Sequence, residues 1–248
     1  MENIEINNNV KINELYDNKT WIHGISKENI KITIFLITIC SDQLKYSLDA
    51  INKLDKNISV LINVIMNIKP TSKAYNEMRV RCKTDFFIQN DEDMELFNNS
   101  LVIFDNIIKN SKSKYFLYSF KLIDNILGIG SPPIIDCIKL YKNKIIKKYP
   151  INTDLKNIVS SVDYFWHQPA LKDGYKSKDT KIKIGYHGKH RSDFDLMLRQ
   201  CKILKSIIDS NIKTNSGHIC KLLRSLNKKS ENLIDYFYII INHFIFFT

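Results

Sequence analysis

Glycine, proline and paired cysteines are all scarce in this sequence. Its 248 residues include only 7 glycines and 5 prolines, while 44% are hydrophobic and 25% are charged. This is the composition of an ordinary globular protein that can bury a sizeable core. The five cysteines, at positions 40, 82, 137, 201 and 220, form no C-x-x-C pair. Their spacing indicates neither a zinc site nor a disulfide framework and favours a reducing cytoplasm.

Arginine is much rarer than lysine. The formal net charge is +11, yet arginine occurs only at positions 79, 81, 191, 199 and 224, so lysine supplies nearly all of the positive charge. Because specific reading of bases depends on bidentate arginine contacts, a nucleic-acid partner is not expected. A solvated, lysine-rich surface that favours phosphate-bearing ligands is the preferred interpretation.

Long apolar runs are also missing. The stretch 236–247, YFYIIINHFIFF, has about a dozen apolar residues, whereas a helix that spans a bilayer needs roughly 20. We expect it to form a buried closing helix or strand; the alternative is an interfacial anchor that makes peripheral membrane contact. The segment 1–20 is polar and contains no secretory signal, so a cytoplasmic location is expected.

Apolar periodicity predicts strands that alternate with helices. The expected strands are 31–39, 58–67, 85–89, 114–120, 134–142 and 181–187, and the expected helices are 42–54, 72–82, 96–110 and 194–208. Continuous β-branched runs such as KITIFLITI are typical of strands buried on both faces. The order predicts an α/β fold with a mostly parallel sheet flanked by helices. We assign residues 1–30 to an N-terminal extension, 31–208 to the main domain and 209–248 to a C-terminal tail that packs on it.

Polar residues follow three of the predicted strands, at 38–42, 67–69 and 90–93. Ligands of such sheets bind beyond the carboxyl ends of the strands, so these segments predict a site. In the third segment, TDFFIQNDEDMEL (84–96), Asp91 and Asp93 are separated by a single residue. In an extended segment their side chains share one side and suit a hard cation such as Mn²⁺ or Mg²⁺. The alternative is an acidic turn at the surface.

One stretch resembles a known family. The segment 74–96, AYNEMRVRCKTDFFIQNDEDMEL, looks like the part of GT-A-fold, family 2-like glycosyltransferases in which a helix with an Asn leads into a strand that ends in an Asp-x-Asp metal motif. Asn76 matches the helix Asn, and Asp91 and Asp93 match the motif. Glu77 and Met78 stand where the family has a Gly-containing turn.

Two later segments extend the resemblance to roughly residues 31–190. VDYFWHQPALKDGYKSK (162–178) is similar to the acceptor-side motif of the family, with Asp163 at the position of the catalytic base and Gly174-Tyr175 at the end of the helix. Val162 replaces the acid that commonly precedes that base. KIKIGYHGKH (181–190) brings His187 to the position of a third metal ligand.

The resemblance implies a glycosyltransferase, in which Asp91, Asp93 and His187 hold Mn²⁺ or Mg²⁺ and Asp163 acts as general base for inversion. The donor is a UDP- or GDP-sugar, and the acceptor is a glycan, protein or lipid hydroxyl. Because the Q-x-x-R-W signature of processive synthases is absent, single transfer is expected. The expected donor contacts, drawn from the resemblance and from the strand ends, are Thr38, Asp42, Asn67, Lys73, Asn76, Arg79 and Asn90.

Three alternatives stay open at this stage. Asp136, in the segment expected to build the acceptor side, is a rival catalytic carboxylate. Paired acids on a basic protein also suit a metal-dependent nuclease or nucleotidyl-transferring enzyme. A non-catalytic basic binding module that keeps the same fold is the third.

Overall fold

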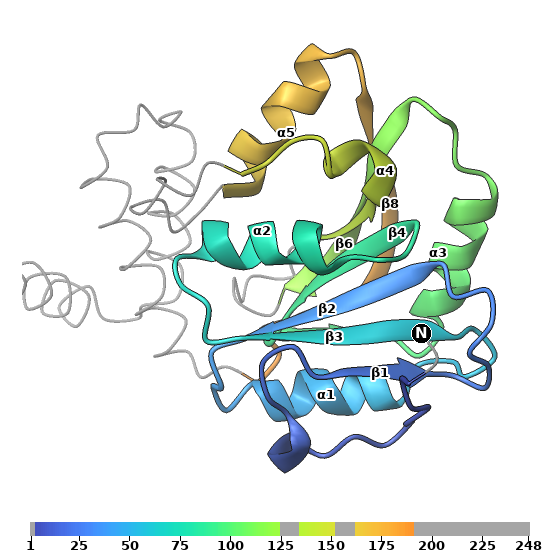
Figure 1. Ribbon diagram of the computed structural model, residues 1–248, viewed down its shortest axis with the longest axis vertical. Coiled ribbons are helices and arrows are strands. Elements are labelled where there is room, and N and C mark those ends of the chain that lie inside the picture. The colour runs from blue at the N-terminus through green and yellow to red at the C-terminus, as the bar shows by residue number, and fades with distance from the viewer. Residues whose placement is uncertain (1–2, 125–133, 152–161, 191–248) are drawn as a thin grey trace, which may run out of the picture.

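The computed structural model describes residues 3–124, 134–151 and 162–190, which build an eight-stranded sheet with helices on both faces (Figure 1). The strand order is β1-β3-β2-β4-β7-β6-β8-β5. The strands are β1 (Thr20–His23), β2 (Ile32–Thr38), β3 (Val60–Met66), β4 (Phe86–Asp91), β5 (Met94–Leu96), β6 (Tyr115–Asp124), β7 (Ile134–Lys142) and β8 (Lys176–His187). The helices are η1 (Ile12–Glu14), α1 (Leu44–Asn52), α2 (Thr71–Arg81), α3 (Ser100–Lys109), α4 (Asn143–Ile146) and α5 (Val162–Lys172).

The α/β class is confirmed, but the prediction of a mostly parallel sheet is wrong because the sheet is mixed. Strand β2 is parallel to β3 and β4, and β6 is parallel to β8. Strands β1, β5 and β7 are each antiparallel to their neighbours. The connection from β6 to β7 is shorter than the dozen or more residues that a parallel crossover needs. Strand β7 therefore runs back between β6 and β4.

Alternation along β4 shows how the sheet divides the core. Ile88 packs in the cluster that α1 and α3 cover, together with Leu48 and Phe104. Phe87 packs in the cluster on the other face, which includes Met78 of α2 and Trp166 of α5. Because neighbouring side chains on a strand point to opposite faces, this continuous apolar run serves both clusters.

Part of the segment assigned to an N-terminal extension belongs to the sheet. Strand β1 pairs with β3, and both Trp21 and Val10 lie in the core. The backbone N–H of Val10 donates to Asn52 Oδ1 at the end of α1. The sheet therefore begins before residue 31.

Several predictions concern residues outside the described ranges: the helix at 194–208, the tail at 209–248 and its apolar run. The backbone of Asp136 lies in β7, but its side chain is outside the described part. Within the described ranges, no helix combines the length and the apolar character that crossing a bilayer requires.

Candidate functional site

Five strands run in the same direction and end at one edge of the sheet. Their last residues are Thr38, Met66, Asp91, Asp124 and His187, from β2, β3, β4, β6 and β8. We call this the strand-tip edge. In Figure 1, the labelled ribbons of β2 and β3 run toward it. Every strand that the sequence placed at the site thus ends at one edge.

The three consecutive acids at the end of β4 have separate partners. Asp91 is the last residue of the strand, whereas Glu92 and Asp93 form a turn before β5. The segment from Asp91 to Asp93 is therefore not extended, so the alternation of a strand does not set the relative direction of their side chains.

Asp91 lies in a polar network beside helix α2. Gln89, two residues earlier on β4, donates through Nε2 to both carboxylate oxygens of Asp91, at 3.0 and 3.2 Å. The same Nε2 atom donates to the Tyr75 hydroxyl of α2 at 2.5 Å. Because residues i and i+2 of a strand share a face, Gln89 is placed to orient the Asp91 carboxylate.

Asp163 reaches the same network from helix α5. It lies in the first turn of the helix, where the positive end of the helix dipole favours a carboxylate. Lys139 Nζ of β7 lies 2.6 Å from Asp163 Oδ2, and the Lys139 side chain is only 12% exposed. Lys139 thus places a largely buried ammonium group against this carboxylate.

Asp91 and Asp163 both influence the pKa of two tyrosines, Tyr75 and Tyr141. Burial raises the pKa of Tyr75 well above its ordinary value, and the charges of Asp91 and then Asp163 raise it further. Burial, Asp163 and Asp91 have the same effect on the pKa of Tyr141. Both hydroxyls therefore stay protonated. The two carboxylates come from distant parts of the sequence, yet their charges act on the same pair of tyrosines.

His167 joins this network from the same helix as Asp163. Its Nε2 atom and the Tyr141 hydroxyl share a hydrogen bond of 3.1 Å. Burial lowers the pKa of His167 to about 4, and the opposing charge of Asp163 does not overcome that effect. The imidazole is therefore neutral at pH 7 and serves as a buried hydrogen-bonding partner.

Glu92 organises the loop between β2 and α1. Its Oε2 atom accepts hydrogen bonds from Thr38 Oγ1 at 2.5 Å, from the Ile39 backbone N–H at 3.2 Å and from the Ser41 N–H at 3.1 Å. The residue is 8% exposed. Glu92 is thus a buried clamp, and the Thr38 hydroxyl, expected to contact a nucleoside, donates to it.

Asp93 meets His187 at the end of β8. His187 Nε2 lies 3.3 Å from Asp93 Oδ2, and both side chains are buried. The Gly188 backbone N–H donates to the Asp93 carbonyl at 2.8 Å. Gly185 permits this approach of β5 and β8, because a Cβ there would lie 2.3 Å from the Glu95 carbonyl oxygen.

The Asp93–His187 pair fits a divalent cation in donor chemistry, since carboxylate oxygen and imidazole nitrogen both bind Mn²⁺. The described residues contain no cluster of three or more His, Cys, Asp or Glu side chains that could hold a metal by themselves. The expected trio of Asp91, Asp93 and His187 is therefore not assembled as a closed set. A cation here would complete its shell with substrate or water oxygens.

Besides Thr38, three of the expected donor contacts lie close to the strand-tip edge. Asn90 is buried and donates through Nδ2 to Ser47 Oγ of α1 at 2.8 Å, which turns it to the opposite face from Asp91. Asn67 is exposed, with Nδ2 3.8 Å from Cys40 Sγ. Asp42, before α1, is exposed.

The other three expected contacts lie on α2. Lys73 is exposed in the first turn. Arg79 Nε donates to Asn76 Oδ1 at 3.0 Å, and Arg79 Nη1 donates to the Lys147 carbonyl at 2.9 Å. Asn76 and Arg79 together therefore link α2 to the segment after α4.

Sequence reasoning missed Gln89, Glu92, Lys139 and Tyr75. Gln89 had a usable signal, since it precedes Asp91 by two residues on a strand. Lys139 had none, because its partner Asp163 lies on a different element and a lysine is unremarkable in this lysine-rich chain.

No protein-family model matches the chain, and no curated protein matches it. Among solved structures, residues 1–349 of TarS from S. aureus are similar at 12% identity and a TM-score of 0.46, over 79% of this chain and 70% of that chain. The mannosyltransferase PcManGT from Pyrobaculum calidifontis, in complex with GDP-Man and Mn²⁺, is similar at 10% identity and a TM-score of 0.49, over 75% and 65%. A 4-diphosphocytidyl-2C-methyl-D-erythritol synthase from Anaerococcus prevotii is similar at 10% identity and a TM-score of 0.43, over 71% and 96%. Likenesses of this size do not place the chain in a family.

Proposed function

We propose that the chain is a metal-dependent glycosyltransferase that moves a sugar from a nucleoside diphosphate to an acceptor hydroxyl, once per binding event and with inversion. The observation that supports this proposal best is that the charges of Asp91, at the strand-tip edge, and of Asp163 both raise the pKa of the same two buried tyrosines, Tyr75 and Tyr141. The acceptor is a hydroxyl group of a glycan, protein or lipid.

Asp93 and His187 would hold a divalent cation, with Asp91 as an additional ligand directly or through water. When bound, Mn²⁺ or Mg²⁺ supplies Lewis-acid stabilisation to the negative charge of the departing diphosphate. The Gln89 amide, which donates to both oxygens of Asp91, would hold that carboxylate in one orientation. Glu92, through its three hydrogen bonds, fixes the loop after β2 beside them.

Asp163 would act as general base. In the transfer, the bond between the anomeric carbon and the diphosphate oxygen breaks, the acceptor oxygen bonds to the opposite side of that carbon, and its proton passes to Asp163. Lys139, whose Nζ lies 2.6 Å from Asp163 Oδ2, would hold that carboxylate in one orientation before the reaction. The Tyr75 hydroxyl, whose pKa is raised by burial, accepts a hydrogen bond from Gln89 and would help to hold the Gln89 amide beside Asp91.

Calorimetric titration of UDP, GDP and their sugars, with and without Mn²⁺, tests the donor site. We expect binding that requires the metal, and its loss in Asp93→Ala and His187→Ala. A nucleotide that binds equally well without metal, or unchanged affinity in both variants, would contradict the assignment. Release of pyrophosphate from a nucleoside triphosphate and a sugar phosphate would instead indicate nucleotidyl transfer.

Asp163→Asn separates chemistry from binding. We expect donor affinity to persist while transfer is lost. Asp179→Asn is a matched control, because Asp179 is also paired with a lysine, Lys121, at 3.3 Å. If Asp163→Asn transfers sugar at the rate of the unmodified protein, another group is the base.

A further inference from the structure

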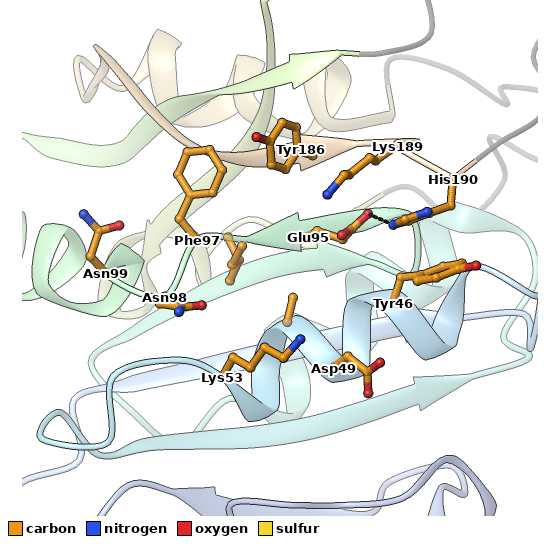
Figure 2. A pocket seen from close by; sticks show the side chains of 12 residues that line it. Tyr46, Asp49, Lys53, Glu95, Phe97, Asn98, Asn99, Tyr186, Lys189 and His190 are labelled. Carbon is orange, nitrogen blue, oxygen red and sulfur yellow. Dashed lines mark ion pairs between the residues drawn. The ribbon is translucent and has the colours of Figure 1, made fainter.

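A cavity of about 570 Å³ lies between helix α1 and the strand pair β5–β8 (Figure 2). Its volume falls within the range of small-molecule sites. Tyr46, Asp49 and Lys53 line one wall; they are spaced by three and four residues, so they form one stripe along α1 that ends at its C-terminal cap, Lys53. The opposite stripe of the helix, which includes Leu48 and Ile51, is buried in the core. The core thus holds this wall in place.

One end of the cavity is closed by a packed trio of side chains. The His190 ring stacks on Tyr46, with ring centroids 3.6 Å apart and planes 13° apart. His190 Nε2 lies 3.4 Å from Glu95 Oε1, the contact drawn as a dashed line in Figure 2. Gln43 Nε2 also donates to the His190 carbonyl at 3.5 Å. These contacts connect α1, β5 and the residues after β8, so three segments build a defined end wall.

The cavity is separate from the candidate cation pair, although it shares strand β8 with it. Tyr186 lies opposite Glu95 in the β5–β8 register, and His187 lies opposite Met94. Neighbouring residues of a strand point to opposite sides, so Tyr186 lines the cavity while His187 points away from it toward Asp93.

The charges around the cavity are balanced. Asp49 and Glu95 contribute two carboxylates, and Lys53 and Lys189 contribute two ammonium groups. Figure 2 shows both lysine side chains reaching toward the space between the walls. An anionic ligand would face the two carboxylates and a cationic ligand would face the two ammonium groups, and either arrangement weakens binding. A neutral ligand with many hydrogen-bonding groups meets neither cost.

The remaining lining suits a ring with one apolar side. Phe97 and Tyr186 pack edge to face with ring centroids 5.2 Å apart, and they present aromatic surface to the cavity. The amides of Asn98 and Asn99 each offer both donors and an acceptor. We propose that this cavity binds a neutral saccharide unit, with its hydroxyls on the carboxylates, ammonium groups and amides and its C–H groups against the aromatic rings.

The saccharide would form part of the acceptor if the chain transfers sugars; that role rests on the proposed function, whereas the binding itself does not. A subsite beside the strand-tip edge would hold a glycan while another of its residues is extended. Such a contact adds affinity for longer acceptors over single sugars.

Saturation-transfer difference NMR on the full chain tests the inference with methyl α-D-glucopyranoside, methyl α-D-mannopyranoside, N-acetylglucosamine, maltose and N,N′-diacetylchitobiose, without metal or nucleotide. We expect at least one of them to bind with Kd on the order of 1 mM. Asp49→Ala and Lys53→Ala, both exposed changes on α1, should each weaken it about tenfold. Glu28→Ala, an exposed acid outside the cavity, should leave it unchanged.

Three outcomes would overturn the inference: none of the five saccharides binds, both α1 variants bind as the unmodified chain does, or glucose 6-phosphate binds more tightly than every neutral sugar. The two proposals are distinguished by two separate titrations: nucleotide with Mn²⁺ on the unmodified chain, and saccharide on Asp93→Ala in EDTA. Saccharide binding by Asp93→Ala, together with no metal-dependent nucleotide binding by the unmodified chain, supports this site and removes the transferase. Metal-dependent nucleotide binding without any saccharide signal supports the transferase and removes this site.

Discussion

The two faces of the sheet handle polar residues differently at the strand-tip edge. On the face covered by α2 and α5, Asp91, Asp163 and Lys139 form a charged network. On the face covered by α1 and α3, Asn90 bonds to Ser47 and is fully buried. The neighbours Asp91 and Asn90 thus differ in kind: Asp91 belongs to a charged network on one face, and Asn90 uses a neutral hydrogen bond to fix α1 against the other.

The three consecutive acids at positions 91–93 also differ from one another in their partners. Asp91 joins the charged network, Glu92 clamps the loop after β2, and Asp93 pairs with His187 on β8. Closeness in sequence is thus no guide to a shared role. Variants at these positions should separate catalytic residues from structural ones.

The largest effect is expected on transfer chemistry at Asp163. Asp163→Asn keeps the size of the side chain and a hydrogen-bond acceptor for Lys139, but it cannot take a proton. If the protein transfers sugars as proposed, the rate should fall by about 10²- to 10⁴-fold. Single-turnover assays with saturating donor measure it, and an unchanged melting temperature shows that the fold is intact.

Glu92→Ala should have the largest effect on stability. It leaves the Thr38 hydroxyl and two backbone N–H groups without the carboxylate that accepts from them, and hydrogen bonds to charged groups are strong. We expect a loss of about 3 kcal/mol in the free energy of unfolding, measured by urea denaturation. Asp91→Ala should change it by less than about 1 kcal/mol, because Asp91 is partly exposed. Equal losses of unfolding free energy in both variants would contradict the distinction between a structural Glu92 and a partly exposed Asp91.

These residues also show what the sequence could predict. The strands at 32–38, 60–66 and 86–91 coincide with continuous apolar runs. Such a run is typical of a strand that is buried on both faces of a sheet, so these strands could be predicted. The directions of β5 and β7 were beyond reach, because an apolar strand looks the same in either orientation. Strand β5 is also too short to show a period.

The candidate site was predictable in outline only. The position of Asp91 and Asp93 after a strand placed them at the correct edge, but the backbone turn at Glu92 decides where each side chain points. The pairing of Lys139 with Asp163 depends on how β7 and α5 pack together, which no single segment encodes. The contact of Gln89 with Asp91 was within reach, because both residues lie on one strand. The cavity beside α1 depends on His190 meeting Tyr46 from a segment far along the chain.

Acid should destabilise the protein through His167. Its pKa in the folded state, about 4, lies below the ordinary 6.5, so the unfolded chain binds more protons between these values. The contribution of His167 to the free energy of unfolding is fully present above pH 6.5. It falls by up to about 3 kcal/mol as the pH drops to 4, and does not change further below that pH. Burial also lowers the pKa of His23, which adds a loss in the same direction. Urea titrations across this range measure it.

His167→Gln is the matched variant for that experiment. It keeps a hydrogen-bonding group beside Tyr141 but cannot titrate, so the curve between pH 4 and 6.5 should become flatter. An identical pH dependence in both proteins would show that His167 is not buried in its neutral form.

Gly185→Ala tests the close approach of β5 and β8. The new Cβ would lie 2.3 Å from the Glu95 carbonyl oxygen and 3.1 Å from Leu122, so one strand must shift. We expect a loss of about 2 kcal/mol and weaker Mn²⁺ binding through Asp93 and His187. Gly174→Asn is the control: Gly174 has φ +84° and nothing near its Cβ position, and Asn tolerates that backbone. Equal small losses in both would mean that β5 moves freely.

Arg79→Ala should have the smallest effect and bears on the face that carries the charged network. The guanidinium of Arg79 bonds to Asn76 and to the Lys147 carbonyl, so its removal should cost about 1 kcal/mol by releasing one link between α2 and the segment after α4. Because those bonds direct Arg79 along the helix, nucleotide affinity should stay within twofold of the unmodified chain in the calorimetric titration. A tenfold loss of affinity at unchanged stability would instead extend the donor site from Asp91 along α2 to Arg79, and the charged face would then be larger than the Asp91–Asp163 network alone.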